Sequence, residues 1–299
     1  MPSRSTTSGS FCGPEPHRPP ENPINIDLHS HSSQSDGLLR PQDVAARAHA
    51  NGVDVWALSD HDELSGLDEA ASAARSLGMA FIPGVEISVT FCEKTVHILG
   101  LNIDARHDHL RDGLQTVRAS RHVRARQIAD RLHDLGLGDC YEGALALAQN
   151  PDLLSRAHFA RFLHETGACR SMQKAFDKYL GDGRPAFVPV QWAGLDQAIE
   201  WIRGAGGKAV IAHPGRYTFS PQQFDALFER FKELGGVGIE VVTGSHAPRQ
   251  YAEYARVARH YGFEGSRGSD FHAPGRSRVD LGALPDLPLD VTPVWHDWL

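Results

Sequence analysis

The sequence has few cysteines and none of the long apolar runs that mark membrane or secreted proteins. Its four cysteines are Cys12, Cys92, Cys140 and Cys169, and no two of them form a CxxC pair. Neither a disulfide framework nor a thiolate zinc site is therefore indicated. A run of about 18 apolar residues, which a membrane helix needs, is absent. The N-terminal region also lacks the apolar stretch of a secretory signal. We expect a cytoplasmic protein that does not bind membranes.

The chain has no excess of basic residues. It contains 30 Lys plus Arg against 37 Asp plus Glu, for a formal net charge of −7, which gives little support to extended binding of nucleic acid. Apolar residues make up 41% and charged residues 22% of the 299 residues, as in folded globular proteins. The length fits one large domain, or one domain with an insertion. The unusual count is that of histidine, with 17 residues.

Short apolar runs alternate with helical patterns from residue 24 onward. The expected strands are 24–28, 54–58, 80–82, 187–190, 209–212, 238–242 and 263–265, with a hairpin of 86–91 and 95–101. The expected helices are 42–51, 67–77, 195–203, 222–234 and 249–261. Such alternation predicts an α/β fold with a mainly parallel sheet covered by helices, either open or closed into a barrel.

Two stretches depart from this alternation. Residues 1–23 are rich in Ser, Thr, Gly and Pro and nearly free of apolar side chains, so we expect a disordered leader. Residues 104–185 show only helical periodicity, which predicts an all-helical insertion. The α/β domain is accordingly predicted in two parts, over residues 24–103 and 186–299.

Candidate metal ligands follow most of the expected strands. They lie at the carboxyl ends of strands, where α/β sheets and barrels place their sites, or within the hairpin. The residues are His29, His31, Asp36, His61, Glu86, His97, His213, Asp270 and His272. Any one of them alone is more readily explained as a structural or surface residue, but nine at one end of several strands favour a polynuclear site.

The residue types indicate which metals fit. The pairs His29/His31 and Asp270/His272 have the period-two spacing that directs both side chains to one face of a strand. Imidazole and carboxylate ligands without thiolate suit Zn²⁺, Mn²⁺ or Fe²⁺ better than a zinc finger or a Ca²⁺ cage. A carboxylate such as Glu86 can bridge two cations at the roughly 3.5–4 Å separation used by two-metal hydrolases. The sequence therefore predicts a hydrolytic centre.

These residues belong to a series of motifs in a fixed order. The motifs are IDLHSHS at 26–32, SDG at 35–37, SDHD at 59–62, PGVEI at 83–87, HILG at 97–100, IAHPG at 211–215 and GSDFH at 268–272. The set resembles the polymerase and histidinol phosphatase (PHP) family. The resemblance covers about residues 24–275 and implies a distorted (β/α)₇ barrel with a trinuclear centre. It implies three divalent cations per chain, with Mn²⁺ favoured and Zn²⁺ or Fe²⁺ as alternatives.

Carried over motif by motif, the resemblance makes all nine residues above metal ligands. Four of them, His29, His31, Glu86 and Asp270, are expected to act in catalysis as ligands of the metals that carry the attacking hydroxide. Glu86 is expected to bridge two of these metals. The chain departs from the family pattern at none of the nine, which favours an active enzyme. Asp60 and Asp62 flank His61, and we expect Asp60 to orient this ligand or to steer a proton.

The insertion resembles that of one branch of the family, the nucleoside 3′,5′-bisphosphate phosphatases, whose members also act as 5′→3′ exoribonucleases on short RNA. The stretches that carry this likeness are SRHVR at 120–124, SRAHFA at 155–160, GIEV at 238–241 and GSH at 244–246. The likeness implies a substrate-binding cap and a metal-dependent phosphoesterase that removes the 3′-phosphate of such nucleotides. Short 5′-phosphorylated RNA is a further expected substrate, and no obligate protein partner is indicated.

The insertion also carries unexpected charge on an apolar helix face. Leu110, Leu114 and Val117 begin an apolar stripe that Ile128, Leu132 and Leu135 continue, and Arg121 and Arg124 lie between them. An inward-facing arginine needs an anionic partner or access to solvent. A substrate phosphate is one interpretation, and arginines that reach solvent at the edge of the stripe are the other.

Three further residues are candidates for substrate binding. Arg156 follows Ser155, a good helix N-cap, at a helix start suited to anions, although a solvated arginine is also common there. Arg216 follows the HPG motif, and His246 follows another strand. Two other functions stay open from the sequence: a histidinol-phosphate-type phosphatase of the same family, and a non-catalytic RNA-binding module.

Overall fold

Seven strands form a single sheet whose spatial order follows the chain. The computed structural model describes residues 24–298 apart from 149, 190, 191 and 276, so the expected leader lies outside the described residues. The strands are β1 (Ile26–Asp27), β2 (Val55–Leu58), β3 (Ala80–Phe91), β4 (Lys94–Leu101), β5 (Lys208–Ile211), β6 (Gly238–Thr243) and β7 (Glu264–Gly268). Neighbours pair in parallel except that β4 is antiparallel to both β3 and β5.

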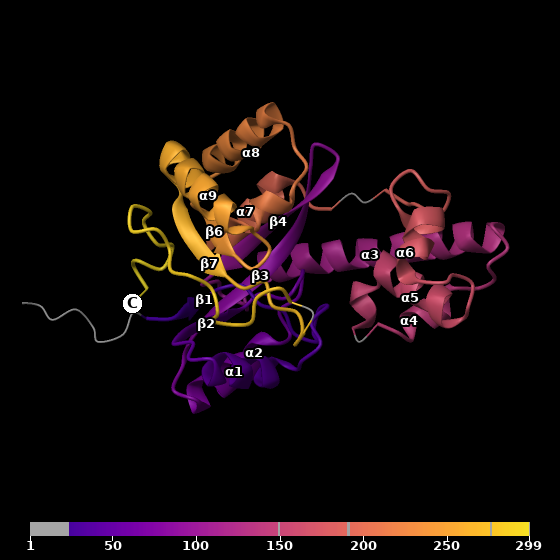
Figure 1. The fold of residues 1–299 in the computed structure, drawn as a ribbon, viewed down its shortest axis with the longest axis horizontal. Helices are drawn as coiled ribbons and strands as arrows, with labels where there is room; N and C mark the ends of the chain where they lie inside the picture. The colour runs from indigo at the N-terminus through magenta and orange to yellow at the C-terminus, as the bar shows by residue number, and fades with distance from the viewer. Residues whose placement is uncertain (1–23, 149, 190–191, 276, 299) are drawn as a thin grey trace, which may run out of the picture.

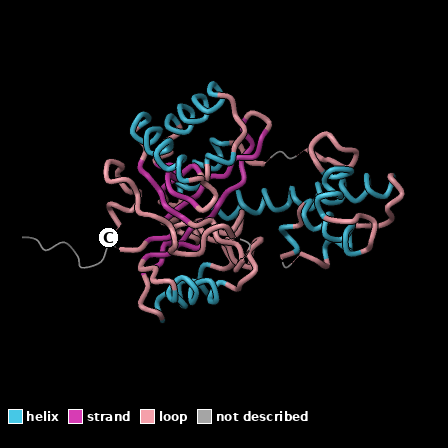
Figure 2. The backbone as a smooth tube through the Cα atoms, in the orientation of Figure 1, coloured by secondary structure: helices cyan, strands magenta, loops and turns pink. Residues whose placement is uncertain are grey.

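The two edges of the sheet meet, so the sheet is a nearly closed barrel. The amide of Leu28 donates to the carbonyl of Arg267 at 3.0 Å, and the amide of His31 donates to that of Phe271 at 2.8 Å. Helices lie on both sides of the strands (Figures 1 and 2). They are α1 (Pro41–Ala50), α2 (Leu67–Ser76), α7 (Leu195–Gly204), α8 (Pro221–Glu233) and α9 (Pro248–Tyr261). The α/β barrel expected from the sequence is confirmed.

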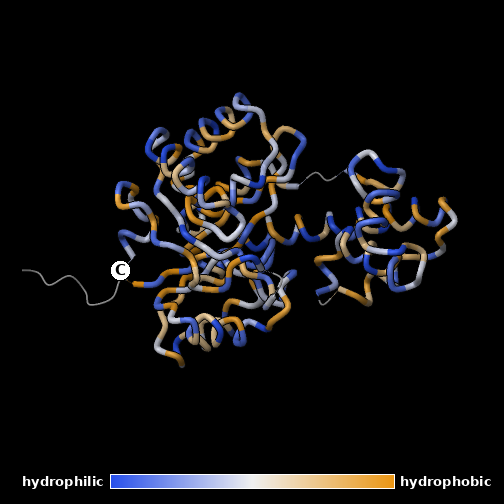
Figure 3. The backbone as a smooth tube through the Cα atoms, viewed as in Figure 1, coloured by the Kyte–Doolittle hydropathy of each residue, from blue (hydrophilic) through white to orange (hydrophobic). Residues whose placement is uncertain are grey.

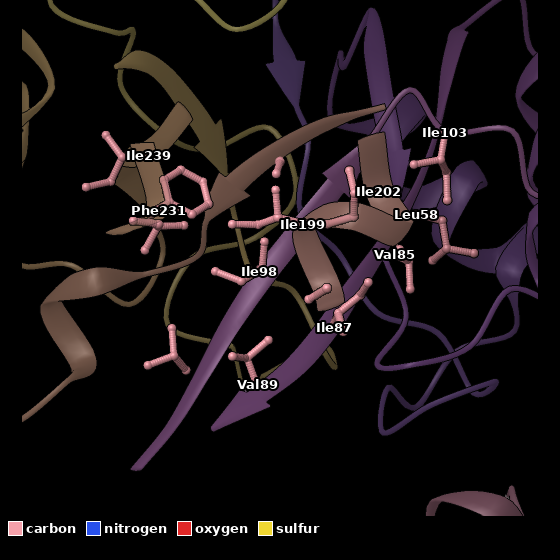
Figure 4. Close-up of a cluster of buried hydrophobic side chains, with 14 of the residues drawn as sticks. Leu58, Val85, Ile87, Val89, Ile98, Ile103, Ile199, Ile202, Phe231 and Ile239 are labelled. Atoms are coloured by element: carbon pink, nitrogen blue, oxygen red, sulfur yellow. The ribbon is translucent and has the colours of Figure 1, made fainter. Parts of the chain in front are cut away.

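The core has two layers because side chains alternate along each strand. One set faces the helices, where Ile87 and Ile98 of the hairpin pack with Ile199 and Ile202 of α7 (Figure 4). The other set lies inside the barrel, and it includes Val294 from the C-terminal segment. Coloured by hydropathy, the chain shows apolar residues on the strands and on the helix faces turned toward them (Figure 3).

A helical block, residues 108–180, joins β4 to the second half of the barrel. It comprises α3 (Asp108–Asp134), α4 (Tyr141–Leu145), α5 (Arg156–Glu165), α6 (Met172–Ala175) and the short turns η1 (Pro151–Leu153) and η2 (Phe176–Leu180). The described part of the chain between β4 and α7 contains no strand. Within the described residues, no helix combines the length and the apolar character needed to span a membrane.

Helix α3 belongs to two cores. Its first half packs on the barrel through Leu110 and Leu114, while Ile128 and Leu132 pack inside the block (Figure 1). The expected apolar stripe is therefore present, except that Leu135 caps the helix and is 43% exposed. The second core extends past residue 185, so the boundaries at 104 and 185 stay predictions.

Two expected strands differ from the structure. The runs 80–82 and 86–91 are parts of one continuous strand, β3, because the intervening residues pair with β2 and β4. The expected strand at 187–190 is wrong for residues 187–189, which are not in a strand, and residue 190 lies outside the described residues. Val188 packs into the core of the helical block instead, and Pro189 lacks the amide hydrogen that a strand ladder needs.

Phe159→Ala is expected to lower the free energy of unfolding of the helical block by about 3–5 kcal/mol, because Phe159 is fully buried in the second core. Denaturant titration followed by circular dichroism measures this loss. Val123→Ala is the matched control, since Val123 lies on α3 in the same block but is 62% exposed. Equal effects of the two substitutions would contradict a packed core in the block.

Candidate metal centre

The structure brings all nine sequence-predicted ligands together, with Glu86 and His97 inside the β3–β4 hairpin and the other seven in the loops that follow β1, β2, β5 and β7. Ligand atoms from these side chains form four overlapping groups, and within each group they lie within 4.8 Å of one another. The groups are His31, Asp36, His61 and His272; His29, Glu86 and His213; His29, His31 and Asp270; and His61, Glu86 and His97. Shared members link the groups into one cluster, as expected for a polynuclear centre.

Glu86 lies at the middle of this cluster and is fully buried. Its Oε1 is 2.8 Å from His213 Nε2 and 3.1 Å from His97 Nδ1. Its Oε2 is 3.1 Å from His61 Nδ1 and 3.3 Å from the Nε2 atoms of His29 and His31. Each carboxylate oxygen thus faces a different set of imidazoles, which is the arrangement that a bridging carboxylate requires.

Two further carboxylates complete the cluster on the side of β7. Asp270 Oδ1 lies 3.4 Å from His31 Nε2 and 3.5 Å from His272 Nδ1. Asp36 Oδ1 lies 3.2 Å from His272 Nε2, and its other oxygen lies 3.8 Å from His61 Nε2. Each of the three carboxylates therefore lies among imidazoles of the cluster.

Several of these buried polar atoms have no hydrogen-bond partner among the described residues. They are Nδ1 of His31, His61 and His213, Oε2 of Glu86 and Oδ1 of Asp270. Buried polar atoms are nearly always paired, because an unpaired one keeps its full desolvation cost. Divalent cations would satisfy these nitrogen and oxygen donors, so the residues present fit such metal ions.

Burial and neighbouring charges shift the pKa values of the clustered side chains in opposite directions. Burial alone would raise the pKa of Glu86, but the surrounding histidines outweigh it and hold the pKa well below the usual range. Burial lowers the pKa of His61 to about 3, against the attraction of Glu86 and Asp36. For Glu86 and His61 these are the forms that bind metals. Burial disfavours the charged form of His31, but Asp270 and Glu86 outweigh it and raise the pKa of His31 to about 10, so a bound metal would displace a proton from that imidazole.

The backbone is strained where the ligands are placed. Asp62, His213 and Asp270 adopt positive φ values of 51°, 27° and 54°, a region that costs energy for residues other than glycine. Gly268, two residues before Asp270, packs closely against the chain after β1. A Cβ atom at this position would lie 2.3 Å from the Cβ of His29, so only glycine fits here. Close approach of β7 to β1 thus brings Asp270 to the ligands of β1.

Glu240 is a site residue that the sequence analysis did not single out. Its side chain is fully buried on β6, with Oε1 2.9 Å from His29 Nδ1. Its Oε2 accepts a 2.6 Å hydrogen bond from the amide of His213. Glu240 therefore orients one ligand and holds the backbone of another. The sequence signals were an acidic residue inside an otherwise apolar strand and its place in the GIEV stretch at 238–241.

Glu240→Gln is expected to lower the affinity for divalent metal by about 10- to 100-fold, because the carboxylate that accepts from His29 is lost. Metal titration by calorimetry measures this change. Glu264→Gln is the control, since Glu264 pairs with Lys208 at 3.0 Å at the start of β7, the opposite end of the barrel. Unchanged metal affinity in the Glu240 variant would rule out the orienting role.

Asp60 and Asp62 flank His61 but their carboxylates point to other groups. Asp60 accepts from the amide of Ser32 at 2.7 Å and from the hydroxyl of Ser35 at 2.5 Å, so it shapes the loop between the ligands of β1 and Asp36. Asp62 accepts from the amide of Ser88 at 2.7 Å and forms an ion pair with Arg121. Asp62 thereby links the metal centre to α3.

The three predicted arginines of the helical block form one positively charged cluster. Burial and the charges of Arg156 and Arg121 lower the pKa of Arg124 to about 10. Arg124 donates from Nε to the carbonyl of Val188, and its buried Nη2 has no partner among the described residues. Arg121 also stacks on Trp192, and Arg156 pairs with Asp182 at 2.9 Å. This cluster could bind an anion.

The other two predicted substrate residues differ in exposure. Arg216 is 51% exposed, lies 3.2 Å from Asp270 Oδ2, and lines a cavity of about 630 Å³ together with Asp36, His61, His97, Asp270 and His272. His246 is only 3% exposed, and its ring nitrogens face the Gly215 amide at 2.9 Å and the Val241 carbonyl at 3.2 Å. His246 thus holds the loop after His213 rather than facing the cavity.

The family follows from a match to a domain model. Residues 27–243 match the PHP domain, which is more than half of the chain. The chain belongs to the PHP family. The match includes Glu240 and the helical block as well as seven of the nine clustered ligands, while Asp270 and His272 lie beyond it.

Two proteins are similar to this chain over most of their length. A 3′,5′-nucleoside bisphosphate phosphatase from Chromobacterium violaceum is 46% identical over 273 residues, which are 91% of this chain and 96% of the relative. A 5′–3′ exoribonuclease from Haemophilus influenzae is 43% identical over 270 residues, 90% of this chain and 97% of the relative.

Two solved structures agree with the fold. A structure of an amidohydrolase from Chromobacterium violaceum, with bound sulfate and no metal, superposes with a TM-score of 0.84 at 46% identity and covers 92% of this chain and 95% of its own. A candidate metal-dependent phosphoesterase from Bifidobacterium adolescentis gives a TM-score of 0.73 at 26% identity, with 93% and 95% coverage.

Proposed function

We propose that this protein is a metal-dependent phosphoesterase that hydrolyses the 3′-phosphate of nucleoside 3′,5′-bisphosphates and degrades short 5′-phosphorylated RNA in the 5′→3′ direction. The observation that carries this function is the cluster of nine His, Asp and Glu side chains around the buried Glu86, with a cationic cluster next to it. The relatives from Chromobacterium violaceum and Haemophilus influenzae support both activities. The enzyme works in the cytoplasm and without an obligate protein partner.

We assign the nine clustered side chains as ligands of three divalent cations, with Mn²⁺ as the favoured metal. When bound, the metals neutralise the charge of the phosphoryl oxygens and lower the pKa of the attacking water. Glu86 would hold metal through its central carboxylate, and His29, His31 and Asp270 would hold the metals that activate the attacking water. Arg216, which is half exposed at the edge of the cluster, adds a hydrogen-bond donor for the phosphoryl group.

The arginine cluster supplies selectivity for a second phosphate. The unpartnered Nη2 of Arg124 and the positive charges of Arg121 and Arg156 suit the 5′-phosphate of the nucleotide. A bound phosphate would relieve the mutual repulsion of these arginines. Binding energy from this remote phosphate then helps to hold the 3′-phosphate in position for hydrolysis.

The test is phosphate release from adenosine 3′,5′-bisphosphate, with and without added Mn²⁺ and after chelation. We expect metal-dependent release that exceeds release from a simple phosphomonoester and from histidinol phosphate. A 5′-phosphorylated oligoribonucleotide should yield nucleoside 5′-monophosphates. Preference for histidinol phosphate would contradict the substrate assignment, and metal-independent binding of RNA without hydrolysis would contradict the enzymatic one.

A further inference from the structure

The cavity of the metal centre has a polar rim that the ligand set does not explain. Besides the ligands, it is lined by Arg216 after β5, Gly244 and Ser245 after β6, and Ser277 and Arg278 after β7. The arginines of the helical block are absent from this lining. They approach the centre from the other side, since Arg121 reaches it through Asp62 after β2 and Ser88 on β3. The two cationic groups therefore flank the metal centre from different parts of the barrel.

Two groups on this rim have donors to spare. The Ser245 hydroxyl is buried and has no hydrogen-bond partner among the described residues. The Arg278 side chain is exposed, and its Nη1 makes only a long 3.4 Å contact to the Ser245 carbonyl. No carboxylate of the described residues lies within ion-pair distance of Arg278. Ser245 and Arg278 both line the cavity, and hydroxyl and guanidinium groups are donors that bind phosphate.

The two proposed substrates differ only beyond the reacting phosphate. In both, the bond from phosphorus to the water oxygen forms, the bond from phosphorus to the 3′-oxygen breaks, and a proton passes to that oxygen. The bisphosphate gives a nucleoside 5′-monophosphate and inorganic phosphate, whereas RNA gives the same nucleotide and an RNA shortened at its 5′ end. Only RNA has a further strand that must leave the metal centre.

We propose that Arg278 and the Ser245 hydroxyl form a subsite for the first phosphate downstream of the scissile bond in RNA. This inference rests on the proposed function. With the 5′-phosphate on the arginines of the helical block and the scissile phosphate on the metals, the downstream strand leaves toward the loops after β6 and β7. Arg278 is thus a residue that distinguishes RNA from mononucleotide, while Arg216, which touches Asp270, serves both substrates.

The experiment compares Arg278→Gln with the parent enzyme on a 5′-phosphorylated trinucleotide and on adenosine 3′,5′-bisphosphate. The trinucleotide is the shortest RNA with a phosphate beyond the scissile one. We expect kcat/KM for the trinucleotide to fall about ten-fold through KM, as for the loss of one charged phosphate contact, with unchanged turnover of the bisphosphate. The slope of log KM against log salt for the trinucleotide should also decrease by about one unit.

A control variant and a second test variant separate the outcomes. Arg256→Gln removes an exposed arginine of α9 that does not line the cavity, and it should leave both substrates unchanged. Ser245→Ala removes the hydroxyl without altering charge, and it should lower trinucleotide turnover but not the salt slope. Equal effects of Arg278→Gln on both substrates, or none on the trinucleotide, would overturn the subsite. Failure of the parent enzyme to hydrolyse either substrate would overturn the proposed function instead.

Discussion

Replacing Glu86 by glutamine is expected to lower turnover of adenosine 3′,5′-bisphosphate by about 10³-fold or more. Both oxygens of Glu86 lie within 3.3 Å of histidine nitrogens, so this carboxylate is shared by most of the cluster. Glutamine has nearly the same shape but is neutral, and its amide nitrogen cannot bind a cation. Metals contribute several kcal/mol of charge stabilisation in such reactions, and each 1.36 kcal/mol corresponds to a ten-fold change in rate.

The measurement combines steady-state kinetics with metal content by mass spectrometry. Circular dichroism and thermal unfolding establish that the Glu86 variant is folded. Glu264→Gln serves as the control, because it makes the same chemical change at the opposite end of the barrel and should retain parent activity and metal content. A Glu86 variant with a tenth or more of the parent activity would show that this residue does not bridge the metals.

Arg124→Gln is expected to lower kcat/KM for the bisphosphate by about 10²-fold, with a much smaller loss for a simple phosphomonoester. Loss of one partner from a buried, charged contact typically costs 2–5 kcal/mol of binding. The phosphomonoester lacks the second phosphate, so it cannot lose this contact. Comparison of the two substrates by phosphate release separates the effect on binding from any general damage to the metal centre.

The stability of the Arg124→Gln variant provides a second measurement. Activity on the bisphosphate should fall, whereas the free energy of unfolding should not. Arg124 is largely buried, and its pKa is lowered by burial and by the charges of Arg156 and Arg121. Its removal should therefore leave the free energy of unfolding unchanged or raise it, as expected for a group kept for function. Arg126→Gln is the matched control, because Arg126 is exposed on α3 and lies over Tyr141. Lower stability with equal loss on both substrates would indicate a structural role.

Most of the barrel was predictable because its signals are local. The alternation of apolar runs and helical patterns located β2, β5 and β6 and the five barrel helices to within one residue or two at each end. The wrong strand at 187–190 has a tertiary cause, since Val188 packs into the helical block and not onto the sheet. An apolar run alone does not specify which core will bury it.

The contacts that cross the barrel were not predictable in the same way. Glu240 lies 211 residues from His29 in the chain, yet it orients this ligand at 2.9 Å. Asp62 and Arg121 are 59 residues apart and pair only because α3 docks on the barrel. His246 turns inward to the backbone of Gly215 and Val241, although its position after a strand suggested a substrate contact.

By itself, the sequence determined the type of fold, the family motifs and the candidate ligands that the structure brings into one cluster. The strands, the helices and the edge that carries the candidate ligands follow from side-chain periodicity and from the rule that the carboxyl ends of parallel strands meet at one edge. The barrel and the ligand assignment follow from the likeness of the motifs to the family. The tertiary structure alone decided which carboxylate orients which histidine, how the arginines of the helical block are paired, and which loops line the cavity. Those relations depend on the closure of β1 against β7 and on the docking of α3, because both bring together side chains that are distant in the chain.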